Sequence, residues 1–353
     1  MSPKFSARTQ WDLQETPYAV ALRRARADVQ PIFDLTASNP TTCSFVYDEG
    51  CLLGLLRQPE ALLYEPDPRG LRRAREAIAS YYQRETGADL DPDHLLLTTS
   101  TSEAYSFLFR LLCDPGEEIL IPQPSYPLFE FLADLEDVRL TPYPLFYDHG
   151  WHLDVAAMEA RITSRTRAIM VVQPNNPTGH FTKSVEREAL ERVCEQHDLA
   201  LIIDEVFLDY ALDSSGNTLR KSRSFTTSNH PVLTFVLSGL SKVAALPQMK
   251  VAWVVCLGPQ DILKQATARL EIIADTFLSM NAPIQHALPG MLAARWDIQQ
   301  QIVARVRGNL ADLDRQLAQQ RMVSRLVVEA GWYVVLRIPA LGSADAAAIR
   351  LLE

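Results

Sequence analysis

The sequence predicts an α/β protein built on a mostly parallel sheet. Short apolar runs alternate with amphipathic segments through the middle of the chain, a pattern typical of strands joined by helices. Helical patterns occupy 102–113 and 185–197. Because parallel strands end at one edge of such a sheet, we expect a ligand to bind at that edge. The runs typical of buried strands are 94–98, 118–121, 168–172, 199–203, 232–237 and 251–256.

The flanking segments predict a second, smaller domain. Residues 70–85 predict a packing helix whose charged residues, Arg75 among them, turn mostly outward. Residues 283–321 predict a long helical stretch that is interrupted near Pro289, and residues 331–338 predict a strand. We therefore expect a large domain at 48–282 and a small domain made of 1–47 and 283–353.

The composition narrows the class of function. A chain of 353 residues with 47% hydrophobic residues can bury one large core or two smaller ones. The net charge of −9 argues against a nucleic-acid partner, and no apolar run is long enough to predict a membrane span. Five scattered cysteines and seven dispersed histidines predict neither disulfides nor a metal site. We expect a cytoplasmic protein that acts on small molecules.

Two charged residues follow predicted strands and are candidates for chemistry. Lys242 comes just after the run 232–237, where a partly buried amine can lose its proton and condense with an aldehyde. The alternative is an ordinary exposed lysine. Asp204 closes the run 199–203, and a buried carboxylate there needs a cationic partner such as a protonated pyridine nitrogen. The alternative for Asp204 is a solvated or helix-capping carboxylate.

Polar and aromatic residues follow the other predicted strands, and each has two interpretations. The hydroxyls of 98–103 open a helix, so they bind a phosphate or simply cap the helix. Tyr126, in Pro-Ser-Tyr-Pro, lies flat against a ring or packs in a braced loop. Residues 175–179, Asn-Asn-Pro-Thr-Gly, offer amides to an anion or only form a turn. Lys250 counters a phosphate or is solvated.

These motifs, in this order along the chain, resemble the aspartate aminotransferase superfamily, the class I and II aminotransferases that use pyridoxal 5′-phosphate. The resemblance implies a pyridoxal-phosphate-dependent transferase fold, with a mostly parallel seven-stranded sheet in the large domain and a smaller α+β domain. The matching segments are Tyr64 with 67–70, then 99–104, 114–118, 124–127, 175–179, 204–206 and 241–242.

The resemblance implies a role for each matching residue. Lys242 would form a Schiff base with the cofactor and then move a proton as general base, while Asp204 would keep the pyridine nitrogen protonated. Tyr126 would stack on the ring, and Asn176 would bond its phenolate oxygen. The phosphate would be bound by Ser100, Thr101, Ser102, Ser241 and Lys250, and by Tyr64 of a neighbouring subunit, which implies a homodimer. The substrate would be contacted by Ser38, Asn39 and Asn176.

The sequence also departs from the pattern of the superfamily. Phe207 replaces a tyrosine whose hydroxyl bonds the ring oxygen, Gly239 replaces a phosphate-binding serine, and Lys250 replaces an arginine. The sequence ends at Glu353, before the region in which the superfamily carries the arginine that binds the substrate carboxylate. Arg337 is the candidate replacement, although a position in a strand fits a structural role better.

We therefore predict an aminotransferase that exchanges an amino group between an amino acid and a 2-oxo acid. Two alternatives remain open. One is a carbon–sulfur β-lyase on the same fold, because both reactions begin with proton removal at Cα. The other is a catalytically impaired protein that binds pyridoxal phosphate or an amino acid without turnover, because the phosphate and carboxylate sites depart from the pattern.

Overall fold

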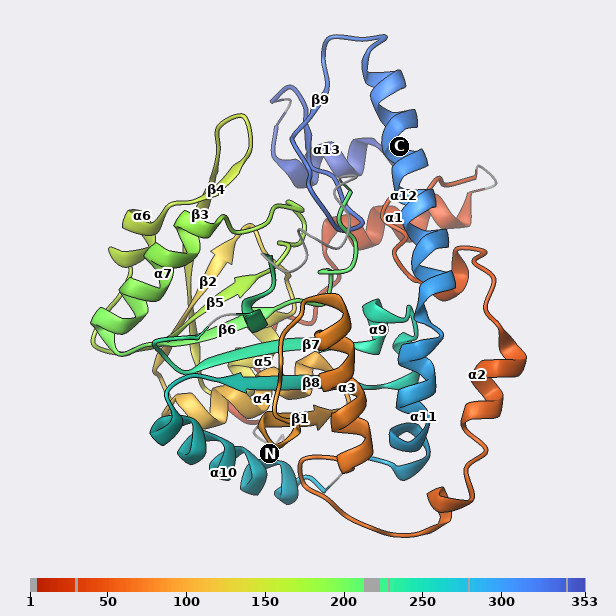
Figure 1. Cartoon of the computed structure of the whole chain (residues 1–353). Coiled ribbons are helices and arrows are strands. Elements are labelled where there is room, and N and C mark those ends of the chain that lie inside the picture. Colours follow the sequence, from red (N-terminus) through yellow and green to blue (C-terminus); the bar gives the residue numbers. More distant parts are fainter. Residues whose placement is uncertain are drawn as a thin grey trace.

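A single large sheet forms the centre of the molecule (Figure 1). The structure is a computed structural model that describes residues 5–28, 31–212, 223–227, 229–278, 280–340 and 342–352. Within these residues the sheet has eight strands in the order β1-β8-β7-β6-β5-β2-β3-β4. The strands are β1 Leu95–Thr98, β2 Glu118–Gln123, β3 Arg139–Tyr147, β4 Trp151–Leu153, β5 Thr166–Val172, β6 Ala200–Asp204, β7 Thr234–Gly239 and β8 Ala252–Leu257.

The α/β class and the mostly parallel sheet are confirmed, and all six predicted strands form. The strand number of seven is wrong, because the hairpin of β3 and β4 extends one side of the sheet. Pro142 and Pro144 lie in the part of β3 that pairs with β2 alone. Both prolines therefore turn the side that lacks an N–H toward the unpaired edge, where no ladder bond is lost.

The direction of the strands brings many of their ends together. Strands β3, β2, β5, β6 and β7 run parallel to one another, and β8 is antiparallel to both β7 and β1. Strand β1 therefore points the same way as β7. The carboxyl ends of β1, β2, β5, β6 and β7 consequently lie along one edge of the sheet, where α/β proteins bind their ligands.

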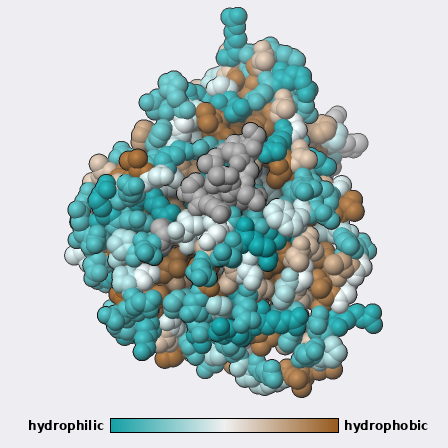
Figure 2. Space-filling view, viewed as in Figure 1, coloured by the Kyte–Doolittle hydropathy of each residue, from teal (hydrophilic) through white to brown (hydrophobic). Residues whose placement is uncertain are grey.

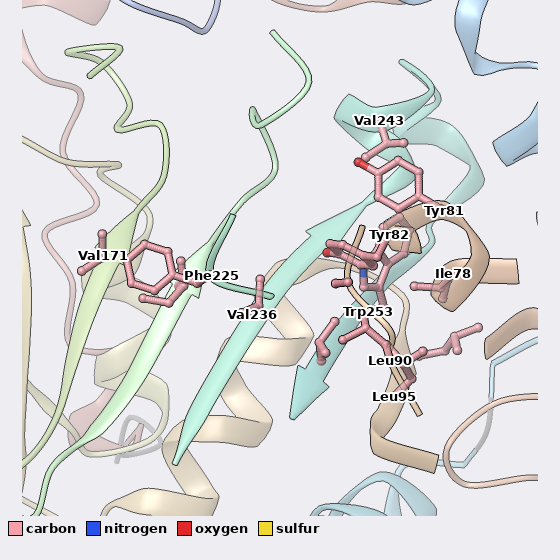
Figure 3. Close-up of a cluster of buried hydrophobic side chains, with 14 of the residues drawn as sticks. Ile78, Tyr81, Tyr82, Leu90, Leu95, Val171, Phe225, Val236, Val243 and Trp253 are labelled. Atoms are coloured by element: carbon pink, nitrogen blue, oxygen red, sulfur yellow. The ribbon is translucent and has the colours of Figure 1, made fainter. Parts of the chain in front are cut away.

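Helices cover both faces of the sheet because successive side chains of each strand alternate between two apolar clusters. Helices α4 (Thr101–Leu112), α5 (Phe129–Leu135) and α10 (Gln260–Thr276) cover one face. Helices α3 (Arg72–Glu85), α7 (Ser184–His197) and α11 (Ala282–Ala293) cover the other. Figure 3 shows the second cluster, in which the Trp253 indole N–H donates to the Tyr82 hydroxyl at 3.1 Å.

Helix α3 packs as predicted, except for one arginine. Arg75, expected to face outward, is only 3% exposed. Its guanidinium donates to the backbone carbonyls of Gly70 and Pro92 and forms ion pairs with Asp67 and Asp93. These partners lie just before and just after the helix, so the arginine ties both flanking loops to it. Helical periodicity alone could not reveal partners outside the helix.

The C-terminal part extends away from the sheet (Figure 1). The predicted helical stretch breaks at Ala294, between α11 and α12 (Arg295–Leu317), and Pro289 lies inside α11, so the predicted position of the break is wrong. The predicted strand at 331–338 is also largely wrong, because only β10 (Leu336–Arg337) forms there, paired with β9 (Ser324–Arg325). Helix α13 (Ala344–Arg350) contacts α1 (Pro17–Ala27). The division into two domains stays a prediction, and parts of its ranges lie outside the described residues.

The remaining helices in the part of the chain that the structure describes are short connections. They are α2 Glu49–Leu55, α6 Val155–Glu159 and α9 Leu240–Val243, with the 3-10 helices η1 Ala7–Thr9, η2 Pro40–Thr42, η3 Pro59–Leu62, η4 Pro92–His94, η5 Phe225–Thr227 and η6 Pro247–Met249. Figure 2 shows polar residues over most of one face, with apolar patches between them. Every helix in the described ranges is too short or too polar to cross a membrane.

Candidate active site

The residues expected to do chemistry follow strands that end at one edge of the sheet. Tyr126 follows β2, Asn176 follows β5, Asp204 ends β6 and Lys242 follows β7. The strand register places Asp204 between Val172 of β5 and Leu237 of β7. Helix α4 begins at this same edge, directly after β1. The sheet topology therefore gathers residues that are far apart in the sequence.

Lys242 lies in the short helix α9 and is partly buried. Its backbone carbonyl accepts a hydrogen bond from the Tyr210 hydroxyl at 2.6 Å. Its Nζ lies 5.4 Å from the ring centre of Phe207 and 5.0 Å from that of Trp332. Burial lowers the pKa of the amine, and the negative charge of Asp204 partly offsets that effect. Lys242 is therefore not the exposed surface lysine of the alternative interpretation.

Asp204 is buried at the end of β6. Its Oδ2 accepts a hydrogen bond from the Tyr105 hydroxyl at 2.6 Å, and its Oδ1 accepts one from the Val206 N–H at 3.0 Å. Burial raises the pKa of Asp204, while these two donors and the Lys242 charge lower it. A carboxylate has room for about four donors, so Asp204 can accept further hydrogen bonds. The alternative of a solvated carboxylate is excluded by its burial.

Tyr126 lies near the same carboxylate. Its ring packs edge-on against Phe129, with 5.7 Å between ring centres, and its side chain is 43% exposed. Burial raises the pKa of the Tyr126 phenol, with further contributions from nearby Tyr333 and Asp204. Because much of its side chain is exposed, Tyr126 is accessible to a planar ligand.

The start of α4 uses part of its polar sequence to cap the helix. The Ser100 hydroxyl oxygen accepts from the Glu103 N–H at 3.1 Å, and the Glu103 carboxylate accepts from the Thr99 N–H at 2.6 Å. Helix capping is therefore present at Ser100. Thr101 and Ser102, both partly buried, occupy the first turn. A helix of twelve residues also carries partial positive charge at this end, which favours an anion.

The Asn-Asn-Pro-Thr-Gly loop forms a turn and also binds the chain segment at Glu329 and Ala330. Asn175 uses its side-chain oxygen to accept from the Thr178 hydroxyl at 2.9 Å, whereas Asn176 is partly exposed beside it. Gly179 has φ +69°, and its carbonyl accepts from the Glu329 and Ala330 N–H groups at 3.0 and 2.8 Å. A Cβ at Gly179 would clash with the Ala330 carbonyl oxygen. The loop thus anchors the segment that leads to Trp332.

One departure from the superfamily pattern, Gly239, has a structural basis. A Cβ at Gly239 would lie 2.9 Å from the Val251 carbonyl oxygen and 3.0 Å from the Ala252 Cβ, so a serine fits only if β8 shifts. Lys250 is exposed and follows η6 with a left-handed backbone, φ 54°. Ser241 is partly buried, next to Lys242.

Other predicted site residues make different contacts. Tyr64, 81% exposed, follows η3, a position open to a neighbouring molecule. Ser38 is partly buried, and Asn39 caps η2 by accepting from the Thr41 N–H at 3.1 Å. Arg337 is exposed in β10, with its guanidinium 5.6 Å from the Tyr147 ring centre. These contacts fit a structural role for Arg337.

The residues at the sheet edge fit pyridoxal phosphate. The group needs an amine that loses its proton readily, a carboxylate for its pyridine nitrogen and a positive site for its phosphate. Lys242 supplies the amine with a lowered pKa, and buried Asp204 has unused acceptor positions. The start of α4 supplies the positive site. We find no conflict between this donor set and the cofactor.

Sequence reasoning missed several contributors to the site. Tyr105 lies on a helix face whose sequence predicts a place in the hydrophobic core, yet its hydroxyl donates a hydrogen bond to Asp204. Tyr210 holds the Lys242 backbone, and Trp332 and Tyr333 come from a segment expected to be a strand. None belongs to a local motif. Only the tertiary fold brings them to the sheet edge.

Comparison with known proteins gives consistent results. The chain matches the family model described as aminotransferase class I and II over residues 55–353. It is 28% identical over 273 residues to the glutamate-pyruvate aminotransferase AlaA of Escherichia coli, which covers 77% of this chain and 66% of that protein. It is 27% identical over 278 residues to the alanine aminotransferase of Mycobacterium tuberculosis, covering 78% of this chain and 63% of the relative.

Solved structures show the same fold. An alanine aminotransferase from Pyrococcus furiosus superimposes with a TM-score of 0.85 at 23% identity, covering 97% of this chain and 86% of the other. A variant of the Thermus thermophilus aspartate aminotransferase gives a TM-score of 0.81 at 21% identity, covering 99% and 90%. From the family match and the shared fold, the chain belongs to the class I and II aminotransferase family.

Proposed function

We propose that the protein is a pyridoxal-phosphate-dependent aminotransferase that exchanges an amino group between an amino acid and a 2-oxo acid. The observation that carries this proposal is the partly buried Lys242 amine near the buried carboxylate of Asp204. Relatives that are named for alanine, or for glutamate and pyruvate, make these compounds the first substrates to assay.

The Lys242 amine is the group that moves protons. Pyridoxal phosphate, when bound, supplies an aldehyde that condenses with amines and a ring that accepts the electrons of a Cα–H bond. Burial lowers the pKa of the Lys242 amine, so Nζ is more readily available in its neutral form to accept the proton from the substrate Cα. Lys242 Nζ would then deliver this proton to the carbon atom of the cofactor's aldehyde group.

The residues around Lys242 bind and orient the cofactor and the substrate. Asp204 accepts a hydrogen bond from the protonated pyridine nitrogen, and the Tyr105 hydroxyl keeps its carboxylate in position. Tyr126 offers its ring face to the cofactor, and Asn176 donates to the ring oxygen. The phosphate binds Ser100, Thr101 and Ser102 at the start of α4. Ser241 and Lys250 would complete this phosphate site, and Ser38, Asn39 and Asn176 would contact the substrate.

We further propose a homodimer in which Tyr64 reaches the phosphate of the neighbouring subunit. Its 81% exposure supports this, because a tyrosine left facing solvent in one chain is free to be covered by a second. A cytoplasmic location is proposed from the scattered, unpaired cysteines of the sequence.

The near-ultraviolet and visible absorbance of purified protein with added pyridoxal phosphate tests the cofactor assignment. We expect an absorbance band that depends on Lys242 and is lost in Lys242→Ala, together with at least a hundredfold loss of turnover, an order-of-magnitude figure for losing a general base. Lys264→Ala, on the exposed side of α10, is the matched control and should keep both. A wild-type spectrum equal to that of Lys242→Ala would contradict the proposal.

The reaction type is tested by the products. With alanine or glutamate, we expect the cofactor to be converted to its amine form and an added 2-oxo acid to be needed for repeated turnover. Release of pyruvate and ammonia from a substrate with a β-leaving group, without any oxo acid, would instead identify a β-lyase. No spectral change with any amino acid would identify a binding protein without turnover.

A further inference from the structure

The Lys242 amine lies against two aromatic rings from distant parts of the chain. Its Nζ is 5.4 Å from the ring centre of Phe207, which follows β6, and 5.0 Å from that of Trp332, which precedes β10. The two rings contact each other edge to face, with centres 5.2 Å apart at 78°. A cation within about 6 Å of an aromatic ring centre is attracted to the ring face. Both rings are therefore close enough to stabilise positive charge on Nζ.

Trp332 and Lys242 are held by the same residue. The Tyr210 hydroxyl donates to the Lys242 carbonyl at 2.6 Å, and the Tyr210 carbonyl accepts from the Gly331 N–H at 2.9 Å. The Tyr210 ring also packs edge to face on Trp332, with centres 5.0 Å apart. Tyr210 thus holds the Lys242 backbone and the Trp332 ring next to each other.

The position of the Trp332 indole ring is unfavourable for its N–H group. Its N–H is buried and has no hydrogen-bond partner among the residues that the structure describes. A buried donor without a partner is unfavourable, and a leucine at this position would avoid that penalty. Hydrogen bonding therefore does not explain why Trp332 occupies this position, whereas its ring contacts with Phe207, Tyr210 and the Lys242 amine do.

We propose that Trp332 is a positioning residue for the Lys242 amine, whose ring face, together with that of Phe207, holds the protonated amine at the carboxyl edge of the sheet. The inference rests on the proposed function, in which Nζ carries a proton between two carbons. The aromatic faces stabilise the amine while it carries that proton.

The groups around the amine determine how its pKa should respond when an aromatic ring is removed. Asp204 of β6 also favours the charged amine, and burial opposes it. The phenols nearby are Tyr105, which bonds Asp204, Tyr126 and Tyr210. Removing one aromatic face leaves Asp204 and these phenols in place, so the affinity of Nζ for its proton should fall where the attraction of the amine to the indole outweighs the burial that the indole adds.

Two pH titrations test the inference on the full chain. The first follows the absorbance of the protein with bound pyridoxal phosphate, and the second follows acetylation of Lys242 before the cofactor is added, by mass spectrometry. In Trp332→Leu both midpoints should move down by about 0.5 to 1 pH unit. Trp332→Phe retains a ring face and should stay nearer the wild-type midpoints. Midpoints in Trp332→Leu equal to those of the wild type would overturn the inference.

A second measurement tests the inference without the Trp332→Leu variant, so it does not depend on whether that variant folds. Replacing the tryptophans with fluorotryptophan weakens the ring face while preserving its shape, so the midpoints should move in the same direction by a smaller amount. The same replacement in Trp332→Phe is the control and should leave them unchanged, and equal shifts in both proteins overturn the inference. The acetylation titration needs no cofactor, so it is interpretable even if the absorbance test of the proposed function fails.

Discussion

Two neighbouring carboxylates at the end of β6 serve different purposes. Asp204 faces the site, whereas the Glu205 carboxylate accepts from the Ser224 hydroxyl at 2.9 Å and from the Phe225 N–H at 2.6 Å. Adjacent residues at a strand end project to opposite sides, which separates the two charges. Burial raises the pKa of Glu205 to about 7, so this carboxyl group is partly protonated at neutral pH.

Glu205 should make the stability depend on pH. Its folded pKa of about 7 lies above its ordinary value of 4.5, so the folded state holds a proton that the unfolded state releases between these values. Its contribution is fully present below pH 4.5 and is lost as the pH rises through 7, a difference of up to about 3 kcal/mol.

In Glu205→Gln this fall in stability over the same pH range should disappear, as measured by urea unfolding at several pH values. The slope is compared rather than the absolute stability, because a glutamine amide meets the Phe225 N–H less well than a carboxyl oxygen does. Glu188→Gln, at an exposed position of α7, is the control and should keep the wild-type slope. A wild-type slope in Glu205→Gln would show that another group titrates.

At the scale of elements, the fold could be predicted where local pattern and tertiary environment agree. The six strands β1, β2, β5, β6, β7 and β8 are continuous apolar runs, and all six were predicted. Strand β3 was not, because Pro142 and Pro144 oppose strand formation unless the strand lies beside an open edge. The predicted strand at 331–338 forms only at β10, and the residues 329–331 at its start are held by bonds to Gly179 and Tyr210, partners that no local pattern reveals.

The loop at Gly179 should be sensitive to a single methyl group. In Gly179→Ala the alanine must adopt a strained positive φ, and its Cβ also clashes with the Ala330 carbonyl oxygen. Gly116 has φ +84° with no atom within 4 Å of a built Cβ, so Gly116→Ala isolates the backbone strain, about 1 to 2 kcal/mol. We expect Gly179→Ala to lose clearly more stability than this control in urea unfolding, and to bind pyridoxal phosphate more weakly. Equal losses in the two variants would show that the docking of 329–331 is unimportant.

At the scale of the whole molecule, the order of motifs in the sequence predicted more than any single motif. Lys242, Asp204, Asn176 and Tyr126 lie beside strand ends that the parallel topology brings to one edge. The topology itself follows from alternating strands and helices. The partners of these residues, such as Tyr105 and Trp332, could not be predicted, since they depend on how helices and the C-terminal segment pack.

Mixed dimers should reveal whether Tyr64 serves the neighbouring subunit. In a hybrid of Tyr64→Ala and Lys242→Ala subunits, one site would combine both defects and the other would have neither. We therefore expect the hybrid to contain one site with wild-type phosphate affinity and activity, although each parent dimer is impaired. If Tyr64 acted within its own subunit, every site of the hybrid would carry a defect and no activity would return.

The docking of the segment 329–333 on Gly179 and Tyr210 also sets the order in which the site is assembled during synthesis. The ribosome releases the sheet, with Lys242 on it, long before it makes Trp332, and domains fold as units as they emerge. Until this segment docks, water can occupy the place beside the amine where the indole will lie. The nascent chain therefore holds a sheet whose Lys242 amine has no indole beside it until the segment 329–333 has been synthesised and has docked.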